Sequence, residues 1–141
     1  MAESSLPVEH LYKITLETGG VPVMIPAAPQ GTRMLVEVKG GKFEGPKLNG
    51  TVVAPGGDWV TQRADGSIKL DVRLVLQTDD GAKILVTYNG IGTVVDGQLK
   101  ARCAPLFETG DERYAWLNSI QAVGIGGLDG TTVVYDIYEL L

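Results

Sequence analysis

Cysteine and histidine are almost missing from this chain, whose 141 residues include one of each, Cys103 and His10. A lone cysteine cannot close an internal disulfide, which is typical of a reducing compartment, so we expect a cytoplasmic protein. Metal sites that use histidine typically need two or three of them, so the sequence predicts no such site. We interpret Cys103 as a small buried side chain and His10 as a packing residue.

The sequence has no basic cluster and no long apolar run. Its net charge is −5 and its isoelectric point is about 4.8, whereas nucleic-acid binding needs a basic footprint. A membrane-spanning helix needs roughly 18 consecutive apolar residues, and the chain has no such run. Residues 1–5 lack the basic and apolar regions of a secretory signal. We therefore expect a soluble protein that binds neither nucleic acid nor a membrane.

Common cofactor and nucleophile motifs are missing as well. The chain has no dinucleotide fingerprint after a strand, no phosphate-binding loop and no nucleophile elbow. The glycines of residues 124–127 precede Leu128 and Asp129 rather than a helix, so they indicate a turn. Asp79 and Asp80 could hold a cation, but a hairpin turn is the favoured interpretation. We accordingly expect no cofactor and no metal ion.

Glycine is abundant, at 19 residues, which is about twice the usual ~7% share. Most of these glycines occur in pairs or after aspartate, as in turns between short strands. The clearest strand covers residues 68–77, where apolar and polar side chains alternate with a period of two. Further strands are predicted over residues 8–18, 33–39, 48–54, 83–89, 99–107, 119–126 and 131–140.

These elements predict an all-β fold in a single domain, residues 1–141. Short strands joined by hairpins fit a sandwich or an antiparallel up-and-down (meander) β-barrel of about eight or nine strands. The barrel is favoured because closure removes exposed strand edges. Residues 55–57 are predicted to form a turn, and one short helical lid is predicted near residues 110–118, after a possible N-cap.

Several strings of residues carry a family resemblance. They are residues 40–52, the Gly-Gly-Asp-Trp string of residues 56–59, and residues 70–73, 78–81 and 107–118. With these strings in this order, the chain resembles members of the DUF3237 (UPF0311) family, which are small proteins of unknown function. The resemblance implies a lipocalin-like or allene-oxide-cyclase-like β-barrel and says little about a reaction.

Asp71 and Arg73 form the first candidate pair, because they share one face of the 68–77 strand, opposite an aliphatic face. Either this polar face meets solvent and the aliphatic side chains fill the barrel, or the polar face lines a cavity and a subunit interface or another sheet covers the aliphatic side chains. We favour the second alternative, in which Asp71 binds ligand and the Arg73 guanidinium stabilises an oxyanion.

Asp58 and Glu108 are the candidate acid–base residues. Asp58 and Trp59 follow the predicted turn and would lie at a barrel rim, where an aromatic surface raises the pKa of a carboxyl group. Glu108 ends a predicted strand and could reach the same pocket, and repulsion would then separate the two pKa values. The structural alternative is a capping carboxylate beside a Trp59 that closes the barrel end.

The remaining candidates are aromatic or amide side chains. Tyr114, Trp116 and Asn118 lie on the predicted lid, and Tyr88 could point into the same space. Tyrosine and tryptophan combine an apolar body with one polar tip, which suits an aromatic ligand. The alternative is that Trp116 only anchors the lid to the core.

Three functions remain open from the sequence. The favoured one is a cofactor-independent enzyme that binds a small apolar carbonyl or enone compound and catalyses cyclisation, isomerisation or addition by acid–base chemistry. The second is a barrel that carries a small lipophilic or aromatic molecule without turnover. The third is a structural protein with a filled barrel. A homo-oligomer is expected under each of them.

Overall fold

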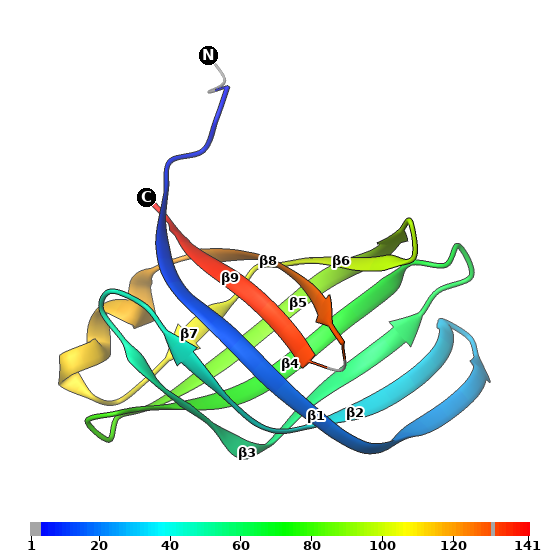
Figure 1. Ribbon diagram of the computed structural model, residues 1–141, viewed down its shortest axis with the longest axis horizontal. Helices are drawn as coiled ribbons and strands as arrows, with labels where there is room; N and C mark the ends of the chain where they lie inside the picture. Colours follow the sequence, from blue (N-terminus) through cyan, green and yellow to red (C-terminus); the bar gives the residue numbers. More distant parts are fainter. Residues whose placement is uncertain (1–3, 131) are drawn as a thin grey trace.

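Antiparallel strands make up most of the chain (Figure 1), and the computed structural model describes residues 4–130 and 132–141. In this part of the chain, no helix is long and apolar enough to cross a membrane. The elements are β1 (Val8–Ala28), β2 (Gly31–Glu44), β3 (Asn49–Gln62), β4 (Ile68–Thr78), β5 (Lys83–Val95), β6 (Gln98–Cys103), β7 (Leu106–Glu108), the 3-10 helix η1 (Glu112–Ser119), β8 (Ala122–Asp129) and β9 (Thr132–Leu140).

The sheet closes on itself into a barrel. Its strand order is β4-β3-β2-β1-β9-β8-β6-β5-β7, and the additional pairing of β4 with β5 joins the two ends. Eight strands therefore form a closed antiparallel barrel, and the short β7 is an extra strand that pairs with β5. Both the β-barrel and the short helix predicted from the sequence are confirmed.

Several strands are longer than the sequence predicts. The turn predicted at residues 55–57 is wrong, because β3 runs through it with a register shift between Val53 and Gly57. Pro55 has no backbone N–H to donate, and an irregularity of this kind is where a strand tolerates proline. The chain reverses instead at residues 45–48 and 63–67. Thr131, the first residue of the last predicted strand, lies outside the described residues.

The half of the barrel next to η1 is filled by large side chains. Tyr12 packs edge-to-face against Phe43 and Phe107, with ring centroids 5.6 and 6.2 Å apart. Leu117 is the one buried residue of η1, is fully buried and belongs to the same core. The helix thus closes this end of the barrel with an apolar side chain.

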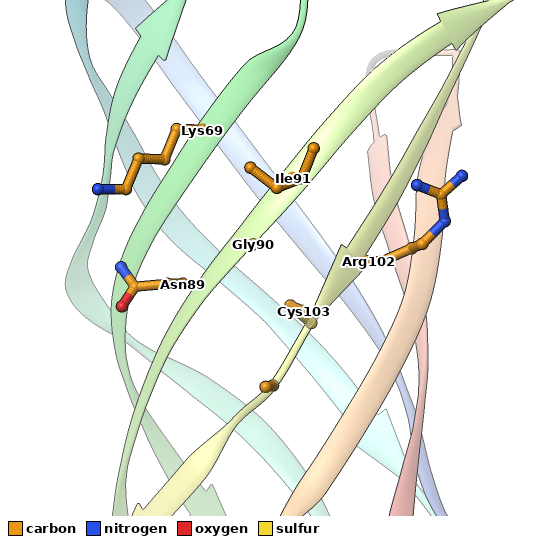
Figure 2. Close-up of a pocket in the computed structure, with 7 residues that line it drawn as sticks. Lys69, Asn89, Gly90, Ile91, Arg102 and Cys103 are labelled. Atoms are coloured by element: carbon orange, nitrogen blue, oxygen red, sulfur yellow. The ribbon is translucent and has the colours of Figure 1, made fainter. Parts of the chain in front are cut away.

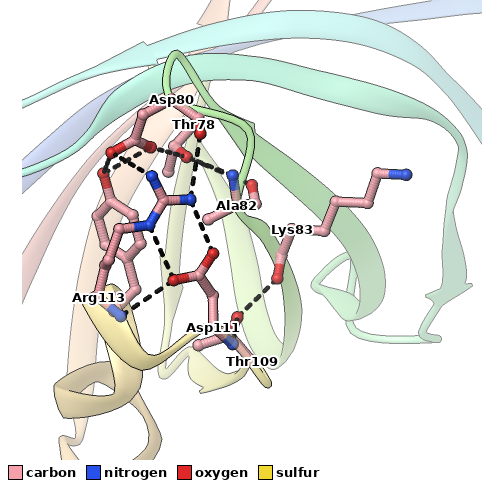
Figure 3. A network of polar contacts seen from close by, with 8 residues as sticks. Thr78, Asp80, Ala82, Lys83, Thr109, Asp111 and Arg113 are labelled. Carbon is pink, nitrogen blue, oxygen red and sulfur yellow. Dashed lines mark hydrogen bonds and ion pairs between the residues drawn. The ribbon is translucent and has the colours of Figure 1, made fainter.

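A polar network holds η1 to the β4–β5 hairpin at this closed end (Figure 3). The Arg113 guanidinium donates to the Asp111 carboxylate at 2.8 Å and lies 3.3 Å from an Asp80 oxygen. The Tyr114 hydroxyl donates to the same Asp80 carboxylate at 3.0 Å. The hydrogen bond from Thr78 is the main cause that lowers the pKa of Asp80, and the Arg113 hydrogen bond lowers the pKa of Asp111. Both carboxylates are therefore held ionised beside Arg113.

Candidate active site: a cavity inside the barrel

A cavity of about 220 Å³ remains in the other half of the barrel. Most of its wall is aliphatic, and a few polar side chains interrupt it. Ile68 and Leu99 of its lining follow the hairpins that join β3 to β4 and β5 to β6, which lie at the end opposite η1 (Figure 1). The lining residues are Leu16, Thr18, Met34, Val36, Val38, Asp58, Val60, Ile68, Leu70, Val72, Tyr88, Leu99, Leu128, Val133 and Tyr135.

Strand register explains why Asp58 points into this cavity. Asp58 pairs with Val36 on β2 and with Val72 on β4, and both of these valines line the cavity. Residues directly opposite each other in an antiparallel ladder share one face of the sheet. Asp58 was expected at a barrel rim, but it lies in the middle of β3 and faces inward.

The Asp58 carboxyl group is anchored by the neighbouring strand. The ladder between β3 and β4 contains the pairs Asp58–Val72 and Thr61–Lys69, but no pair for the two residues of β3 that lie between them. At this interruption the Asp58 Oδ1 atom accepts a hydrogen bond from the backbone N–H of Asp71 at 3.1 Å. This bond fixes one carboxyl oxygen and leaves the other oxygen for a ligand.

Burial raises the pKa of Asp58 to about 6. The hydrogen bond from the Asp71 backbone lowers this pKa and the nearby Asp71 charge raises it, but desolvation is the largest cause. A carboxyl group with a pKa near the working pH can both accept and return a proton. The pKa of Asp58 is therefore raised, as the sequence led us to expect, but by burial in the cavity and not by the Trp59 ring, which lies on the outer face.

Two tyrosines face Asp58 across the cavity. Tyr88 pairs with Val72 across β4 and β5, and its ring packs edge-to-face on Tyr135 of β9 with centroids 5.8 Å apart. Burial is the main cause that raises the pKa of both phenols, and the negative charge of Asp58 adds to the effect on each. Both phenols therefore stay protonated at neutral pH and can donate hydrogen bonds.

The arrangement combines one carboxyl group and two phenols in an apolar wall. The low-polarity surroundings strengthen hydrogen bonds to a charge that develops on a bound molecule. Residues 4–130 and 132–141 contain no group of three or more histidine, cysteine or acidic side chains that could hold a metal ion.

Asp71 and Arg73 lie on the outer face of β4, so the prediction that they line the cavity is wrong. The inward row of this strand is aliphatic, and it includes Leu70 and Val72 of the cavity wall. Alternation shows that residues share a face without showing which face is inside. A barrel of this width must fill its interior with side chains, and the aliphatic row does so.

Trp59 and Glu108 also lie outside the cavity. Trp59 is the residue after the inward-facing Asp58, so its side chain emerges on the outer face, where 42% of its surface is exposed. Glu108 is exposed on β7 and pairs with Leu85, whose side chain is exposed too. The structure therefore does not bring Glu108 and Asp58 into one pocket.

The helix does not cover the cavity, which corrects its expected position as a lid. Tyr114 contacts Asp80, and the Nζ atom of Lys47 lies 5.2 Å from the ring centroid of Trp116. Asn118 accepts a hydrogen bond from the Thr109 backbone N–H at 2.8 Å and donates to the Thr109 carbonyl at 3.0 Å. These side chains shape the closed end.

Of the candidates from the sequence, Asp58 and Tyr88 meet in the cavity, and Tyr135 is a member that the sequence analysis missed. The sequence did contain a signal that Tyr135 faces the interior of the barrel. Val133, Tyr135 and Ile137 alternate along the last predicted strand, and this row faces inward. Cys103 is buried, as expected, and burial raises the pKa of its thiol to about 12. His10 is exposed and its Nε2 atom lies 3.1 Å from Asp136.

Comparison with known proteins shows relatives over nearly the whole chain. A UPF0311 protein from Rhodopseudomonas palustris is 28% identical over 151 aligned positions, which cover 97% of this chain and 98% of that relative. A β-barrel-like protein from Acinetobacter baumannii has a crystal structure that matches with a TM-score of 0.91 at 28% identity, over 99% of both chains.

A third relative has a name that describes a reaction. The hydroalkoxylation enzyme phnH from Penicillium herquei is 35% identical over 117 aligned positions, which cover 83% of this chain and 72% of that enzyme. The family model described as a protein of unknown function (DUF3237) matches residues 6–140. The chain therefore belongs to the DUF3237 family.

Proposed function

We propose that this protein is a cofactor-independent enzyme that adds a hydroxyl group across a polarised C=C bond in a small apolar molecule held inside the barrel. The observation that carries the proposal is the Asp58 carboxyl group, with a pKa of about 6, in an otherwise apolar cavity beside two phenols. The relative named for hydroalkoxylation supports the same reaction class.

The size of the cavity limits the substrate. About 220 Å³ is below the ~300–1,000 Å³ of typical ligand sites and equals roughly seven water molecules at ~30 Å³ each. The aliphatic wall favours a carbon skeleton, and Asp58 and the phenols favour one hydroxyl and one carbonyl oxygen. A compact hydroxy-enone has these features.

The reaction needs two proton transfers, one from the substrate to Asp58 and one from Asp58 back to the substrate. The Asp58 carboxylate accepts the proton of the substrate hydroxyl while that oxygen attacks the β-carbon of the enone. The C=C π-electrons move to the carbonyl oxygen, and the Tyr88 and Tyr135 hydroxyls donate hydrogen bonds to the resulting enolate. The Asp58 carboxylic acid then returns the proton to the α-carbon. The product is a cyclic ether isomeric with the substrate, so no co-reactant is needed.

This mechanism replaces Arg73 with the two phenols as the oxyanion partner. The guanidinium of Arg73 lies on the outer face of β4, with the barrel wall between it and the cavity. A neutral O–H donor also suits an apolar site better, because it carries no charge to be desolvated before the substrate binds.

The test uses a straight-chain methyl enone with a terminal hydroxyl three methylene groups from its double bond. Cyclisation removes the enone absorbance and gives an isomeric tetrahydrofuran that gas chromatography resolves. We expect Asp58→Asn to lower kcat by about 10²–10⁴-fold. Glu108→Gln, which removes a solvent-facing carboxylate, is the matched control and should retain wild-type kcat. Equal rates for wild-type protein and folded Asp58→Asn on this substrate would contradict the assignment.

A non-catalytic carrier is the second candidate, and the mostly aliphatic lining of the cavity favours it. A carrier retains its ligand through purification, and native mass spectrometry would detect the added mass. Retention that is unchanged in Asp58→Asn, together with no turnover of hydroxy-enones, would support the carrier over the enzyme.

A further inference from the structure

The outer wall of the barrel carries a basic groove that the reaction proposed for the interior does not use. Arg33 on β2 pairs with Thr61 on β3, and Thr61 pairs with Lys69 on β4. Side chains paired in this way lie in one row on one face. The exposed Lys69 and the partly exposed Arg33 therefore flank Thr61 on the outer face, and Arg63 lies just past the end of β3. These residues line a groove of about 300 Å³, with Gln30, Trp59 and Asp71.

The groove concentrates positive charge on an acidic protein. Its lining carries three cationic side chains and one carboxylate, whereas the whole chain has a net charge of −5. Within the described residues, the ion pairs involve other cations, so Arg33, Arg63 and Lys69 have no salt-bridge partner there. Cations gathered in a concave surface attract anions.

Trp59 gives the groove an aromatic wall. The residue is 42% exposed, although a tryptophan loses favourable burial by facing solvent. The ring packs close to Gly57, where a Cβ would come within 3.2 Å of it, and the Arg73 guanidinium lies 5.9 Å from its centroid. The glycine and the arginine lie beside the ring, and its exposed surface is available for a planar apolar group.

The basic surface continues beyond the groove. Lys69 also borders a second hollow of about 490 Å³ over β4, β5 and β6, whose lining includes Asn89, Gly90 and Arg102. Figure 2 shows Lys69 and Arg102 on opposite sides of Ile91. Lys69 therefore lies between the two hollows, with a further guanidinium beyond it.

We propose that this groove binds a small aromatic anion, with its phosphate or carboxylate group held by Arg33, Arg63 and Lys69 and its ring against Trp59. Guanidinium groups present planar pairs of donors that match such anions. Arg33 and Lys69 lie on strands that both pair with Thr61 of β3, so the backbones that carry these two cations are held side by side before the ligand arrives. The site lies outside the barrel and stands whether or not the cavity is catalytic.

The test probe is phenyl phosphate, with inorganic phosphate and phenol as comparison ligands. Binding is followed in proton–nitrogen NMR spectra by the shift of the Trp59 indole N–H, which a Trp59→Phe spectrum assigns. We expect a saturable shift with phenyl phosphate and at least about tenfold weaker binding of inorganic phosphate, because the latter lacks a ring to stack.

Arg33→Gln should weaken phenyl phosphate binding by about tenfold or more, since it removes a charge-assisted hydrogen bond. Lys69→Gln, on another strand, should do the same. Lys42→Gln is the matched control, because it removes an exposed cation from β2 outside the groove. Equal weakening by Arg33→Gln and Lys42→Gln would overturn the proposal, as would equal binding of the two phosphates or a shift that never saturates.

Discussion

Asp58 lowers the stability of the folded protein at neutral pH. Its pKa rises from a usual value near ~3.9 to about 6 in the fold, so folding favours the protonated carboxyl group. The stability from this raised pKa is fully present below about pH 4 and is lost as the pH rises through about 6. Above that pH, the ionised group costs roughly 2–3 kcal/mol.

Asp58→Asn should therefore raise the free energy of unfolding at pH 8 by roughly 2–3 kcal/mol. An asparagine Oδ1 atom can still accept the Asp71 N–H, so that bond is kept. At pH 3.5 the two proteins should be nearly equally stable, because Asp58 is then mostly protonated in the unfolded state and almost fully protonated in the folded state. Urea unfolding at both pH values measures the difference. A difference of the same size at the two pH values would show that ionisation of Asp58 is not its cause.

Tyr135→Phe tests the proposed hydrogen bond from the Tyr135 hydroxyl to the enolate oxygen. Removal of one donor to a developing oxyanion costs about 10²-fold or more in kcat, whereas the KM for the hydroxy-enone should change little. Tyr12→Phe is the control, because Tyr12 is fully buried in the packed half of the barrel and does not line the cavity. Similar losses of kcat in both variants would argue against a specific role for Tyr135.

The sequence indicated the type of each candidate residue better than its location. Asp58 and Tyr88 were expected in one site and meet in the cavity. Asp71 and Arg73 were placed on the wrong side, because period-two alternation assigns partners to a face and not a face to the interior. The register between β3 and β4, which no single strand reveals, places Asp58 inside.

At the scale of elements, η1 acts as a plug for the closed end of the barrel. Leu117→Ala should lower the free energy of unfolding by about 2–5 kcal/mol, because it leaves a cavity at a fully buried position. Its kcat on the hydroxy-enone, per folded molecule, should equal that of the wild type. Leu106→Ala, at a leucine that is 52% exposed, should change stability by less than about 0.5 kcal/mol.

Denaturant unfolding and steady-state kinetics of these two leucine variants show whether η1 only closes the end of the barrel or also covers the ligand site. Unchanged stability with a raised KM in Leu117→Ala would identify η1 as part of the ligand site instead.

Strand boundaries were the least predictable feature at this scale. The Pro-Gly-Gly string of residues 55–57 has the composition of a turn, but β3 continues through it, because Gly56 and Gly57 pair with β2 and Gly57 also pairs with β4. The Gly19-Gly20 pair likewise lies within β1, which extends to Ala28. Turn composition is a local signal, and ladder pairing with neighbouring strands can override it.

At the scale of the whole molecule, the alternation and the hairpin spacing predicted an all-β fold, and the need to remove exposed strand edges favoured a closed barrel over a sandwich. The basic groove was not predictable, because Arg33 is distant in the sequence from Arg63 and Lys69, and only the cross-strand pairing of β2, β3 and β4 brings it beside them. A linear search for basic clusters therefore finds none.

Self-association remains a prediction. The aliphatic face of β4, which suggested an oligomer, is covered inside the barrel. Exposed apolar side chains occur instead on the β1 half of the β1–β2 hairpin, where Val21 is 92%, Val23 60% and Ile25 57% exposed. Sedimentation equilibrium should detect an oligomer that Val21→Ser with Ile25→Ser weakens. A wild-type monomer at all concentrations would contradict this expectation.

The central claim is that Asp58 performs proton transfer inside the barrel, and the pH dependence of kcat/KM for the hydroxy-enone tests it most directly. The first step needs the carboxylate, so kcat/KM should rise with pH through about 6, the pKa of Asp58 in the free protein. The residual rate of Asp58→Asn should show no such step. A wild-type profile that is flat between pH 4 and pH 8, or the same step in Asp58→Asn, would contradict the account.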